Sequence, residues 1–261
     1  MLFLNDQFES YYNTIYGKRW AGLRESLIKE SEPIPYSDGL VTPYMLDHAS
    51  VLAALSLRIP GEGPILDACA APGGKSLVIA SIMCPQSTLL SNELSGERRR
   101  RLVKVLDEHL PPEKRERVTV SGFDAAAAGG KKSEHKRFAA ILLDAPCSSE
   151  RHVINNEKAL AEWTPARPRF LAKRQWALLS SAFLLLQPGA SLVYATCAIS
   201  PEENDGVTSR LVDKYRDTVI LDPPDFSEGG ETQYGRIILP DLCGGMGPMY
   251  VARFKKAFLT P

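Results

Sequence analysis

The stretch ILDACAAPGGKS, residues 65–76, decides the fold of this chain. Its apolar start ends in an acid, Asp67, and a tight turn built on Pro72, Gly73 and Gly74 follows. We expect a helix to begin near Lys75, directly after the turn. Because glycines let a ligand approach the backbone closely, this succession of strand, turn and helix predicts a ligand site at the edge of a parallel sheet.

Beyond this stretch, short apolar runs alternate with stretches of helical spacing, which is typical of a parallel sheet covered by helices. The predicted strands are 64–68, 87–92, 118–121, 139–144, 191–196 and 218–221, and the predicted helices are 75–82, 94–109, 169–187 and 201–215. Pro188 and Gly189 predict a helix end, and Pro201 predicts the first position of the next helix. The runs 235–239 and 249–254 predict an antiparallel hairpin that closes the sheet edge. The fold class is therefore α/β.

The chain divides into two parts on the same criteria. Residues 1–60 are predicted to form a helical extension packed on the core, with its clearest helix at 44–57, and residues 61–261 form the α/β domain. The run AAAAGG at 125–130, followed by two lysines, predicts a flexible loop. No internal repeat or low-complexity tract interrupts either part.

Composition excludes several classes of protein. Of 261 residues, 44% are hydrophobic, and 31 basic residues balance 31 acidic ones, so no global positive field gathers nucleic acid. The N-terminal stretch becomes polar too early for a signal peptide, and no apolar run is long enough to cross a bilayer, so a cytoplasmic protein is predicted. Five widely spaced cysteines without a CxxC pair argue against disulfide and zinc frameworks, and no metal is expected.

The glycine turn is compatible with one of three common cofactor sites. A phosphate-binding P-loop requires glycine at position 69, which is Cys69, and the GxGxxG fingerprint of dinucleotide sites is absent. The remaining interpretation is S-adenosylmethionine, whose amino acid part packs against such a turn. Glu93, Asp124 and Asp144 follow the next three predicted strands, where their carboxylates would face the same ligand, although a lone acid there is more often a helix cap.

Two cysteines, Cys147 and Cys197, follow the fourth and fifth predicted strands and so face the same crevice. A small buried cysteine is usually a packing residue, and Cys69 and Cys84 fit that interpretation. A thiolate is also the soft nucleophile that adds to an electrophilic carbon such as C6 of cytosine, which activates C5 for methylation. Near the base, Lys75 and Asp144 would orient the ring or accept a proton.

Three motifs, DACAAPGGK, LLDAPCSS and ATCAISPEEN, resemble motifs I, IV and VI of the Sun (Fmu-type) family of RNA cytosine-5 methyltransferases. Outside them, FESYYNTIYGKRWAGLRESL, DAPCSSERH and GPMYVARF resemble the short branch of this family that contains mitochondrial members. The resemblance therefore extends over essentially the whole chain. It implies a Rossmann-like class I S-adenosylmethionine-dependent fold, with a mostly parallel seven-stranded sheet in the order 3-2-1-4-5-7-6 and an antiparallel edge strand.

The resemblance also implies a role for each motif residue. Cys197 corresponds to the nucleophile of the family, and Cys147 corresponds to the cysteine that assists product release. The residues implied in cofactor binding are Cys69, Ala70, Ala71, Pro72, Gly73, Gly74, Lys75, Glu93, Arg98, Asp124 and Asp144. Aspartate is common at the position of Glu93, so the longer side chain is expected to shift the ribose contact.

The RNA partner is the least determined feature. Many family members carry an added RNA-binding domain, for which this chain has no room, so we expect it to act on RNA in a folded assembly such as a ribosomal subunit, or with a helper protein. Basic clusters at 98–101, 151–152 and 167–174 would hold phosphates, although such runs are usually solvated helix faces. The alternatives are a transfer RNA substrate, a DNA cytosine-5 enzyme that would use Cys147 as its nucleophile, and a non-catalytic assembly factor.

Overall fold

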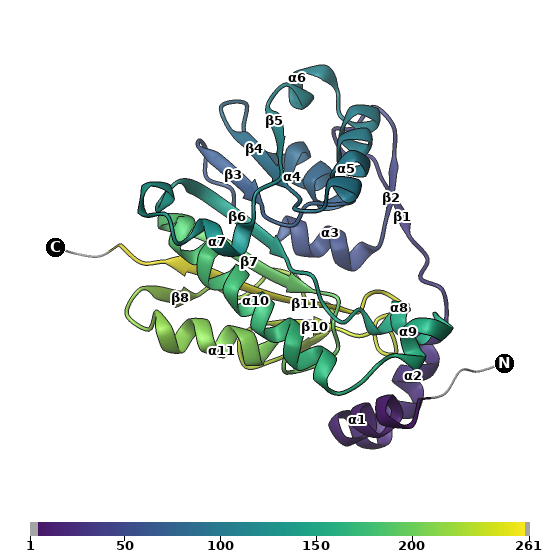
Figure 1. The fold of residues 1–261 in the computed structure, drawn as a ribbon. Coiled ribbons are helices and arrows are strands. Elements are labelled where there is room, and N and C mark those ends of the chain that lie inside the picture. The colour runs from purple at the N-terminus through teal and green to yellow at the C-terminus, as the bar shows by residue number, and fades with distance from the viewer. Residues whose placement is uncertain (1–4, 259–261) are drawn as a thin grey trace.

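The computed structural model describes residues 5–258 and contains a central nine-stranded sheet (Figure 1). The strand order is β5-β4-β3-β6-β7-β11-β10-β9, and β8 also pairs with β11. Their bounds are β3 Pro64–Asp67, β4 Thr88–Asn92, β5 Val118–Ser121, β6 Phe138–Asp144, β7 Leu186–Thr196, β8 Val219–Leu221, β9 Gly230–Glu231, β10 Arg236–Ile238 and β11 Met249–Lys256. Seven of these strands reproduce the expected order 3-2-1-4-5-7-6, and β9 and β10 are additional.

The sheet is parallel from β5 to β7 and antiparallel from β11 onward. β10 and β11 form the predicted antiparallel hairpin, with Ile238 opposite Met249. β11 also pairs with β7 and β8, so it lies inside the sheet rather than at its border. The antiparallel region therefore occupies one edge of the sheet, as predicted, but comprises several strands.

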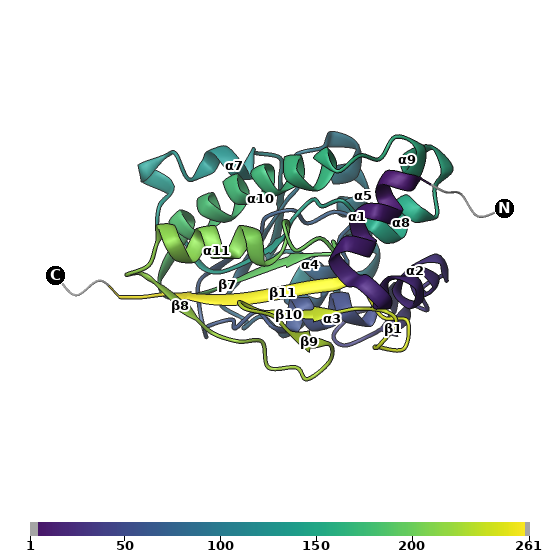
Figure 2. The ribbon, with the colours of Figure 1, turned by 90° about the horizontal axis from the view of Figure 1, so that it is seen from below.

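Helices cover both faces of the sheet, and alternate strand residues point to each (Figure 2). Leu142 of β6 packs with residues of α3, α4 and α5, whereas its neighbour Ile141 packs with residues of α10 and α11. Fully buried parallel strands need this apolar sequence on both faces. The helices are α3 His48–Leu55, α4 Gly74–Ile82, α5 Gly96–His109, α6 Pro112–Arg115, α7 Ala125–Ala128, α8 Glu150–Ile154, α9 Glu157–Ala161, α10 Ala166–Leu185 and α11 Asp205–Lys214, and two short 3-10 turns lie at Gly17–Arg19 and Lys132–Glu134.

The N-terminal helices α1 (Asp6–Tyr16) and α2 (Trp20–Ile28) pack against α8 and α9 rather than on the sheet face (Figure 1). An aromatic cluster joins them, in which the Phe8 and Trp163 rings meet edge-on with centroids 5.0 Å apart. The division into residues 1–60 and 61–261 stays a prediction, and residues 1–4 and 259–261 lie outside the described part of the chain.

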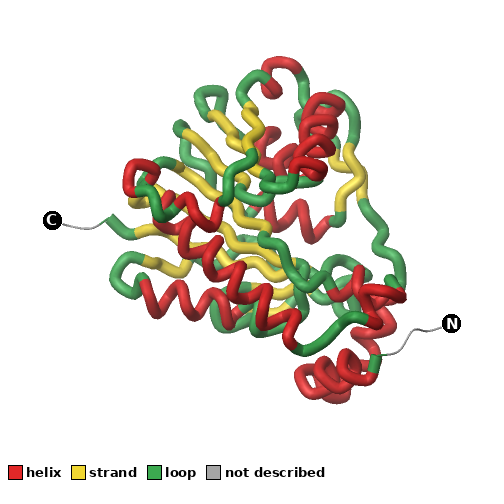
Figure 3. The backbone as a smooth tube through the Cα atoms, viewed as in Figure 1, coloured by secondary structure: helices red, strands yellow, loops and turns green. Residues whose placement is uncertain are grey.

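The predicted helix at 44–57 is wrong in its first turn. Residues Tyr44–Leu46 form strand β2, which pairs with β1 (Ile34–Tyr36) in a hairpin apart from the central sheet (Figure 3). The helix begins only at His48, because the Asp47 side chain accepts a hydrogen bond from the Ala49 amide and caps it.

The predicted flexible loop at 125–130 is also wrong. Residues Ala125–Ala128 form helix α7, which Asp124 caps by accepting from the Ala126 amide. The Gly129 amide then donates to Ser181 Oγ of α10 at 2.7 Å. A run of four alanines has the highest helix propensity, and the cap and the contact with α10 make it ordered.

Two predicted helix boundaries near proline differ from the structure. Residues 201–204 form a turn, and α11 begins at Asp205, because Asn204 has a non-helical backbone and holds Thr196 Oγ1 and the Ala198 carbonyl with its side chain. Strand β7 begins at Leu186, so Pro188 and Gly189 lie inside the strand, where the register with β6 is irregular. Proline is tolerated in a strand at such a bulge.

Candidate active site

The carboxyl ends of the parallel strands β3, β4, β5, β6 and β7 meet at one edge of the sheet, and most of the predicted site residues follow these strand ends. Between β3 and α4, Gly73 has φ +126°, and a Cβ there would lie 2.9 Å from Val105. A side chain at this position would be both strained and in collision with α5, so the turn requires glycine. The turn thus exposes backbone to a ligand while α4 packs closely on the sheet.

A cavity of about 400 Å³ lies on one side of the turn, lined among others by Cys69, Glu93, Arg98 and Asp124. Glu93 is buried, and its Oε1 accepts from the Ser95 amide at 2.9 Å. Its Oε2 has no hydrogen-bond donor within the described residues, since Arg98 Nη1, at 3.3 Å, makes an ion pair without hydrogen-bond geometry. A buried acceptor without a donor is unfavourable unless a ligand supplies one.

Arg98 and Asp124 have structural contacts of their own in this cavity. Arg98 Nη2 donates to the Ala71 carbonyl at 2.8 Å and so braces the glycine turn. Asp124 lines the cavity and at the same time caps α7. A glycine turn beside two acceptor acids fits S-adenosylmethionine, whose ribose hydroxyl groups and adenine amino group are hydrogen-bond donors.

A second cavity lies on the other side of the turn, and Cys69 lines both. The turn residues that line this second cavity are Ala70, Ala71, Pro72, Gly74 and Lys75, together with Asp144 and Ser50. Lys75 Nζ contacts Asp144 Oδ2 at 2.7 Å and Ser50 Oγ at 3.2 Å. Burial opposes the charge of Lys75, but the Asp144 carboxylate outweighs it and raises the pKa of Lys75. Lys75 is therefore charged at neutral pH.

The buried acid Asp67 at the end of β3 does not reach this pair by a hydrogen bond. Its carboxyl accepts from Ser76 Oγ at 2.7 Å, and burial raises the pKa of Asp67 to about 7. This residue ties the strand to α4.

The two predicted cysteines are in contact, with Cys147 Sγ 3.0 Å from Cys197 Sγ. Both are free thiols, and Ser149 Oγ lies 3.3 Å from Cys197 Sγ. The hydrogen bond from Cys147, followed by that from Ser149, lowers the pKa of Cys197 against the effect of burial. The same bond, together with burial, raises the pKa of Cys147 well above its usual value. Of the two thiols, Cys197 is therefore the one that loses its proton more readily.

Cys197 opens into a third cavity, which shares Asp47 and Ser50 with the cavity at Lys75. Its other lining residues include Ser149, Arg151, His152 and the segment 247–249. The structure thus brings Cys197, Lys75 and Asp144 to neighbouring cavities that share Ser50 of α3, with Cys147 in contact with Cys197.

Sequence reasoning missed three of the residues in this region. Asp47 and Ser50 were expected only as part of a helix, although the aspartate before His48 is a typical cap signal. Ser149, whose backbone is left-handed (φ 54°), carried no signal beyond its place in DAPCSS.

Among residues 5–258, no group of three or more histidine, cysteine, aspartate or glutamate side chains is arranged to hold a metal ion. Within the same residues no helix combines the length and apolar character that crossing a membrane requires.

Comparisons with known proteins give relatives over most of the chain. Ribosomal RNA small subunit methyltransferase F of Aeromonas salmonicida is 35% identical over 227 residues, which are 84% of this chain and 46% of that protein. The 5-cytosine rRNA methyltransferase NSUN4 of Bos taurus is 31% identical over 232 residues, 82% of this chain and 60% of the relative. The chain thus spans about half the length of the curated relatives it matches.

Solved structures share the fold. NSun6 from Pyrococcus horikoshii superposes with a TM-score of 0.71 at 23% identity and covers 85% of this chain and 55% of its own. A methyltransferase homolog from the same organism gives a TM-score of 0.76 at 20% identity and covers 98% and 96%. A family model described as 16S rRNA methyltransferase RsmB/F matches residues 54–255. The chain therefore belongs to the RsmB/F family of methyltransferases, which confirms the resemblance carried by the three sequence motifs.

Proposed function

We propose that this protein methylates C5 of a cytosine in ribosomal RNA through a covalent adduct with Cys197. The observation that carries the proposal is the contact of 3.0 Å between the sulfurs of Cys197 and Cys147, which lowers the pKa of Cys197. Cys197 also lines a cavity that shares Asp47 and Ser50 with the glycine-turn cavity. A base held there would be within reach of both sites.

The chemistry follows from the two thiols. The Cys197 thiolate adds to C6 of the cytosine, which forms an S–C6 bond and moves the electron pair of the C5–C6 double bond to C5. S-adenosylmethionine, when bound, supplies the methyl group that C5 accepts. Removal of the C5 proton by a base then restores the double bond as the S–C6 bond breaks and Cys197 leaves as thiolate. Cys147, which holds a proton beside that sulfur, assists the expulsion.

Lys75 and Asp144 orient the base in this proposal. Their ion pair of 2.7 Å fixes both side chains beside the glycine turn, where the carboxylate of Asp144 can accept from the cytosine amino group. The cofactor is held by the turn residues 69–75, by Glu93 with Arg98 behind it, and by Asp124.

Ribosomal RNA of the small subunit is the proposed substrate because methyltransferase F carries that substrate in its name, and NSUN4 is named as an rRNA cytosine methyltransferase. Recognition of the RNA within a folded assembly, a helper protein and a cytoplasmic location remain part of the proposal.

The test is to incubate the protein and S-adenosylmethionine with unmethylated small ribosomal subunits, digest the RNA and measure 5-methylcytidine by mass spectrometry. Product from the wild-type chain, and none from Cys197→Ala, is expected. Cofactor binding without any 5-methylcytidine would instead indicate a non-catalytic assembly factor, and product only in transfer RNA or DNA would change the substrate.

A further inference from the structure

A buried cluster of two carboxyl groups lies beneath the cysteine pair. Glu150, at the start of α8, and Glu203, before α11, are both fully buried, and Ser148 stands between them. Ser148 Oγ is in hydrogen-bond contact with Oε1 of each glutamate. Two carboxyl groups are thus bridged by a single hydroxyl in the interior.

The hydrogens of this cluster can be counted. Glu150 Oε1 also accepts from Tyr12 Oη at 2.6 Å, and its Oε2 accepts from the Ile199 amide at 3.0 Å. Ser148 Oγ has one hydrogen, so it can donate to one carboxyl oxygen and must accept at the other. One of the two carboxyl groups therefore has to carry a proton.

The remaining hydrogen bonds indicate which of the two glutamates carries that proton. Glu203 Oε2 accepts from the Ser148 amide at 3.0 Å and from Gln175 Nε2 at 2.7 Å. Within the described residues, Ser148 Oγ is the one hydrogen-bond partner of Glu203 Oε1. The arrangement that gives Ser148 Oγ and all four carboxyl oxygens a hydrogen-bond partner has the proton on Glu203 Oε1. Glu203 Oε1 then donates to Ser148 Oγ, and Ser148 Oγ donates to Glu150 Oε1.

We propose that Glu203 is a neutral carboxylic acid in the active enzyme and that its proton holds the two cysteine loops in register. This positioning role rests on the proposed function. The cluster joins the loops directly, because Ser148 adjoins Cys147 and the Ile199 amide lies two residues beyond Cys197. Loss of the proton to solvent leaves two carboxylates facing one hydroxyl, and the loops separate.

The surroundings favour the neutral form. Burial, and then the charge of Glu150, raise the pKa of Glu203 to about 8. The other polar or titratable groups that face the cluster are Tyr12 and Tyr16 from α1, Gln175 from α10, Tyr194 from β7 and the two thiols. The pKa values of the three tyrosines and of Cys147 are raised, so these groups are neutral near pH 7, whereas the pKa of Cys197 is lowered.

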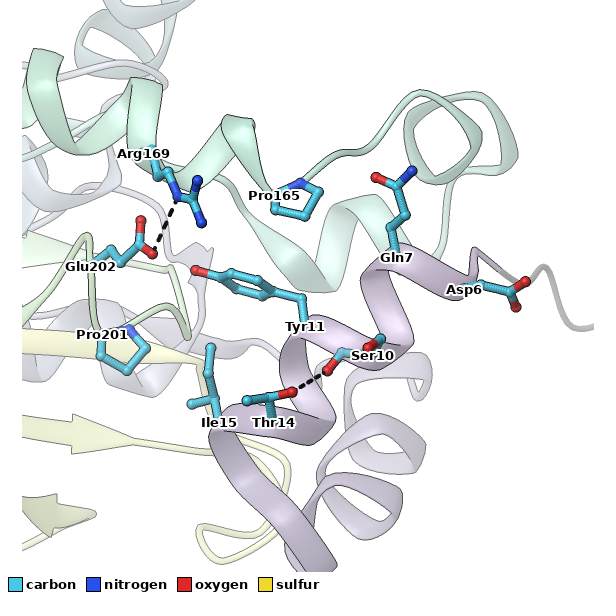
Figure 4. A pocket seen from close by; sticks show the side chains of 10 residues that line it. All are labelled: Asp6, Gln7, Ser10, Tyr11, Thr14, Ile15, Pro165, Arg169, Pro201 and Glu202. Carbon is cyan, nitrogen blue, oxygen red and sulfur yellow. Dashed lines mark hydrogen bonds and ion pairs between the residues drawn. The ribbon is translucent and has the colours of Figure 1, made fainter.

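The adjacent acid Glu202 supplies a matched control. It points outward into a surface groove, where it forms an ion pair with Arg169 at 3.7 Å beside Tyr11 (Figure 4). Glu202 is partly exposed, and within the described residues no hydrogen bond or ion pair joins its side chain to Ser148, Glu150 or Glu203. A charge change at Glu202 therefore leaves the buried cluster intact.

The experiment compares the wild type with Glu203→Gln and Glu202→Gln. In Glu203→Gln the new side-chain NH₂ group donates to Ser148 Oγ at every pH. Its oxygen still accepts from the Ser148 amide and from Gln175 Nε2. Because ionisation of Cys197 also changes the rate over this range, the rate of the wild type is divided by that of Glu203→Gln at the same pH. For a single group with a pKa of about 8, this ratio should fall about tenfold between roughly pH 7 and pH 9. The ratio for Glu202→Gln should follow that of the wild type.

A readout that needs no activity is the infrared band of protonated carboxyl groups. It should disappear from the wild type with a midpoint near pH 8 and be weaker in Glu203→Gln at neutral pH. Asp67, whose pKa is about 7, also contributes to this band. The variant Asp67→Asn removes that contribution and leaves the band of the glutamate cluster, which can then be measured even if Glu203→Gln does not fold. An Asp67→Asn protein without that band at neutral pH would overturn the inference, as would an unchanged alkaline loss in Glu203→Gln. An inactive protein that retains the band would contradict only the proposed function.

Discussion

At the scale of single residues, the two thiols at the sheet edge differ in acidity because one hydrogen bond runs between them. This bond raises the pKa of Cys147 and lowers that of Cys197. In the proposed mechanism, this asymmetry assigns different steps to two chemically identical side chains. It also separates the proposed RNA enzyme from the DNA-type alternative, in which Cys147 would attack.

Substitution of each cysteine should therefore give a different product. Cys197→Ala should form neither an adduct nor 5-methylcytidine, because the nucleophile is absent. Cys147→Ala should accumulate RNA covalently bound to Cys197, because expulsion loses its proton donor. A denaturing gel with labelled RNA detects the adduct, and Cys84→Ala, a partly buried free thiol away from the site, serves as the control. The reverse pattern of adducts would favour the DNA-type mechanism.

Glu93 should matter for cofactor affinity because its buried Oε2 has no donor within the described residues. Glu93→Gln removes the charge that strengthens a hydrogen bond to a ribose hydroxyl, a contribution of about 1.5 to 3 kcal/mol. Titration calorimetry should show the Kd for S-adenosylmethionine rising by roughly tenfold or more. The exposed Glu97→Gln on α5 should bind like the wild type, and equal affinities for the two variants would remove Glu93 from the site.

At the scale of elements, the sequence pattern within a segment predicted its secondary structure. Features that depend on contacts between segments were not predicted. All six strands predicted between residues 64 and 221 are present, and the parallel ones were evident because their apolar runs reflect burial on both faces. The turn at residues 201–204 was not predictable from Pro201, because it depends on hydrogen bonds of Asn204 with Thr196 and Ala198 at the end of β7.

The site residues at strand ends were predicted together because parallel strands place them at one edge. The contribution of α3 was not, since that helix comes from before the sheet in the chain.

The Asn204 contacts lead to a prediction for this turn. Its Oδ1 accepts from Thr196 Oγ1 at 2.6 Å and its Nδ2 donates to the Ala198 carbonyl at 2.9 Å, so the side chain clamps both neighbours of Cys197. Asn204→Ala should lower the free energy of unfolding by about 2 kcal/mol, because two buried polar groups lose their partners. Urea titration measures this loss, and the exposed Asn13→Ala on α1 should stay within about 0.5 kcal/mol of the wild type.

At the scale of the whole molecule, charge is balanced and many of the basic residues that were candidates for RNA contact are engaged within the protein. Arg98 braces the glycine turn, Arg151 donates to the Gly245 carbonyl, and Arg169 pairs with Glu202. Such residues have less freedom to neutralise phosphates. With 31 basic and 31 acidic residues, the molecule also lacks the long-range field that collects naked RNA.

The rate of methylation should therefore depend on how the RNA is presented. A folded subunit offers shape and protein contacts that a free strand lacks, so we expect kcat/KM on unmethylated small ribosomal subunits to exceed that on an isolated hairpin of the same site by at least about tenfold. Rates on both substrates, taken at several salt concentrations, measure the difference. Because few phosphates are neutralised, the salt dependence on the hairpin should be shallow. Equal rates on the two substrates, or a steep loss of hairpin methylation with salt, would mean that this chain selects its RNA alone.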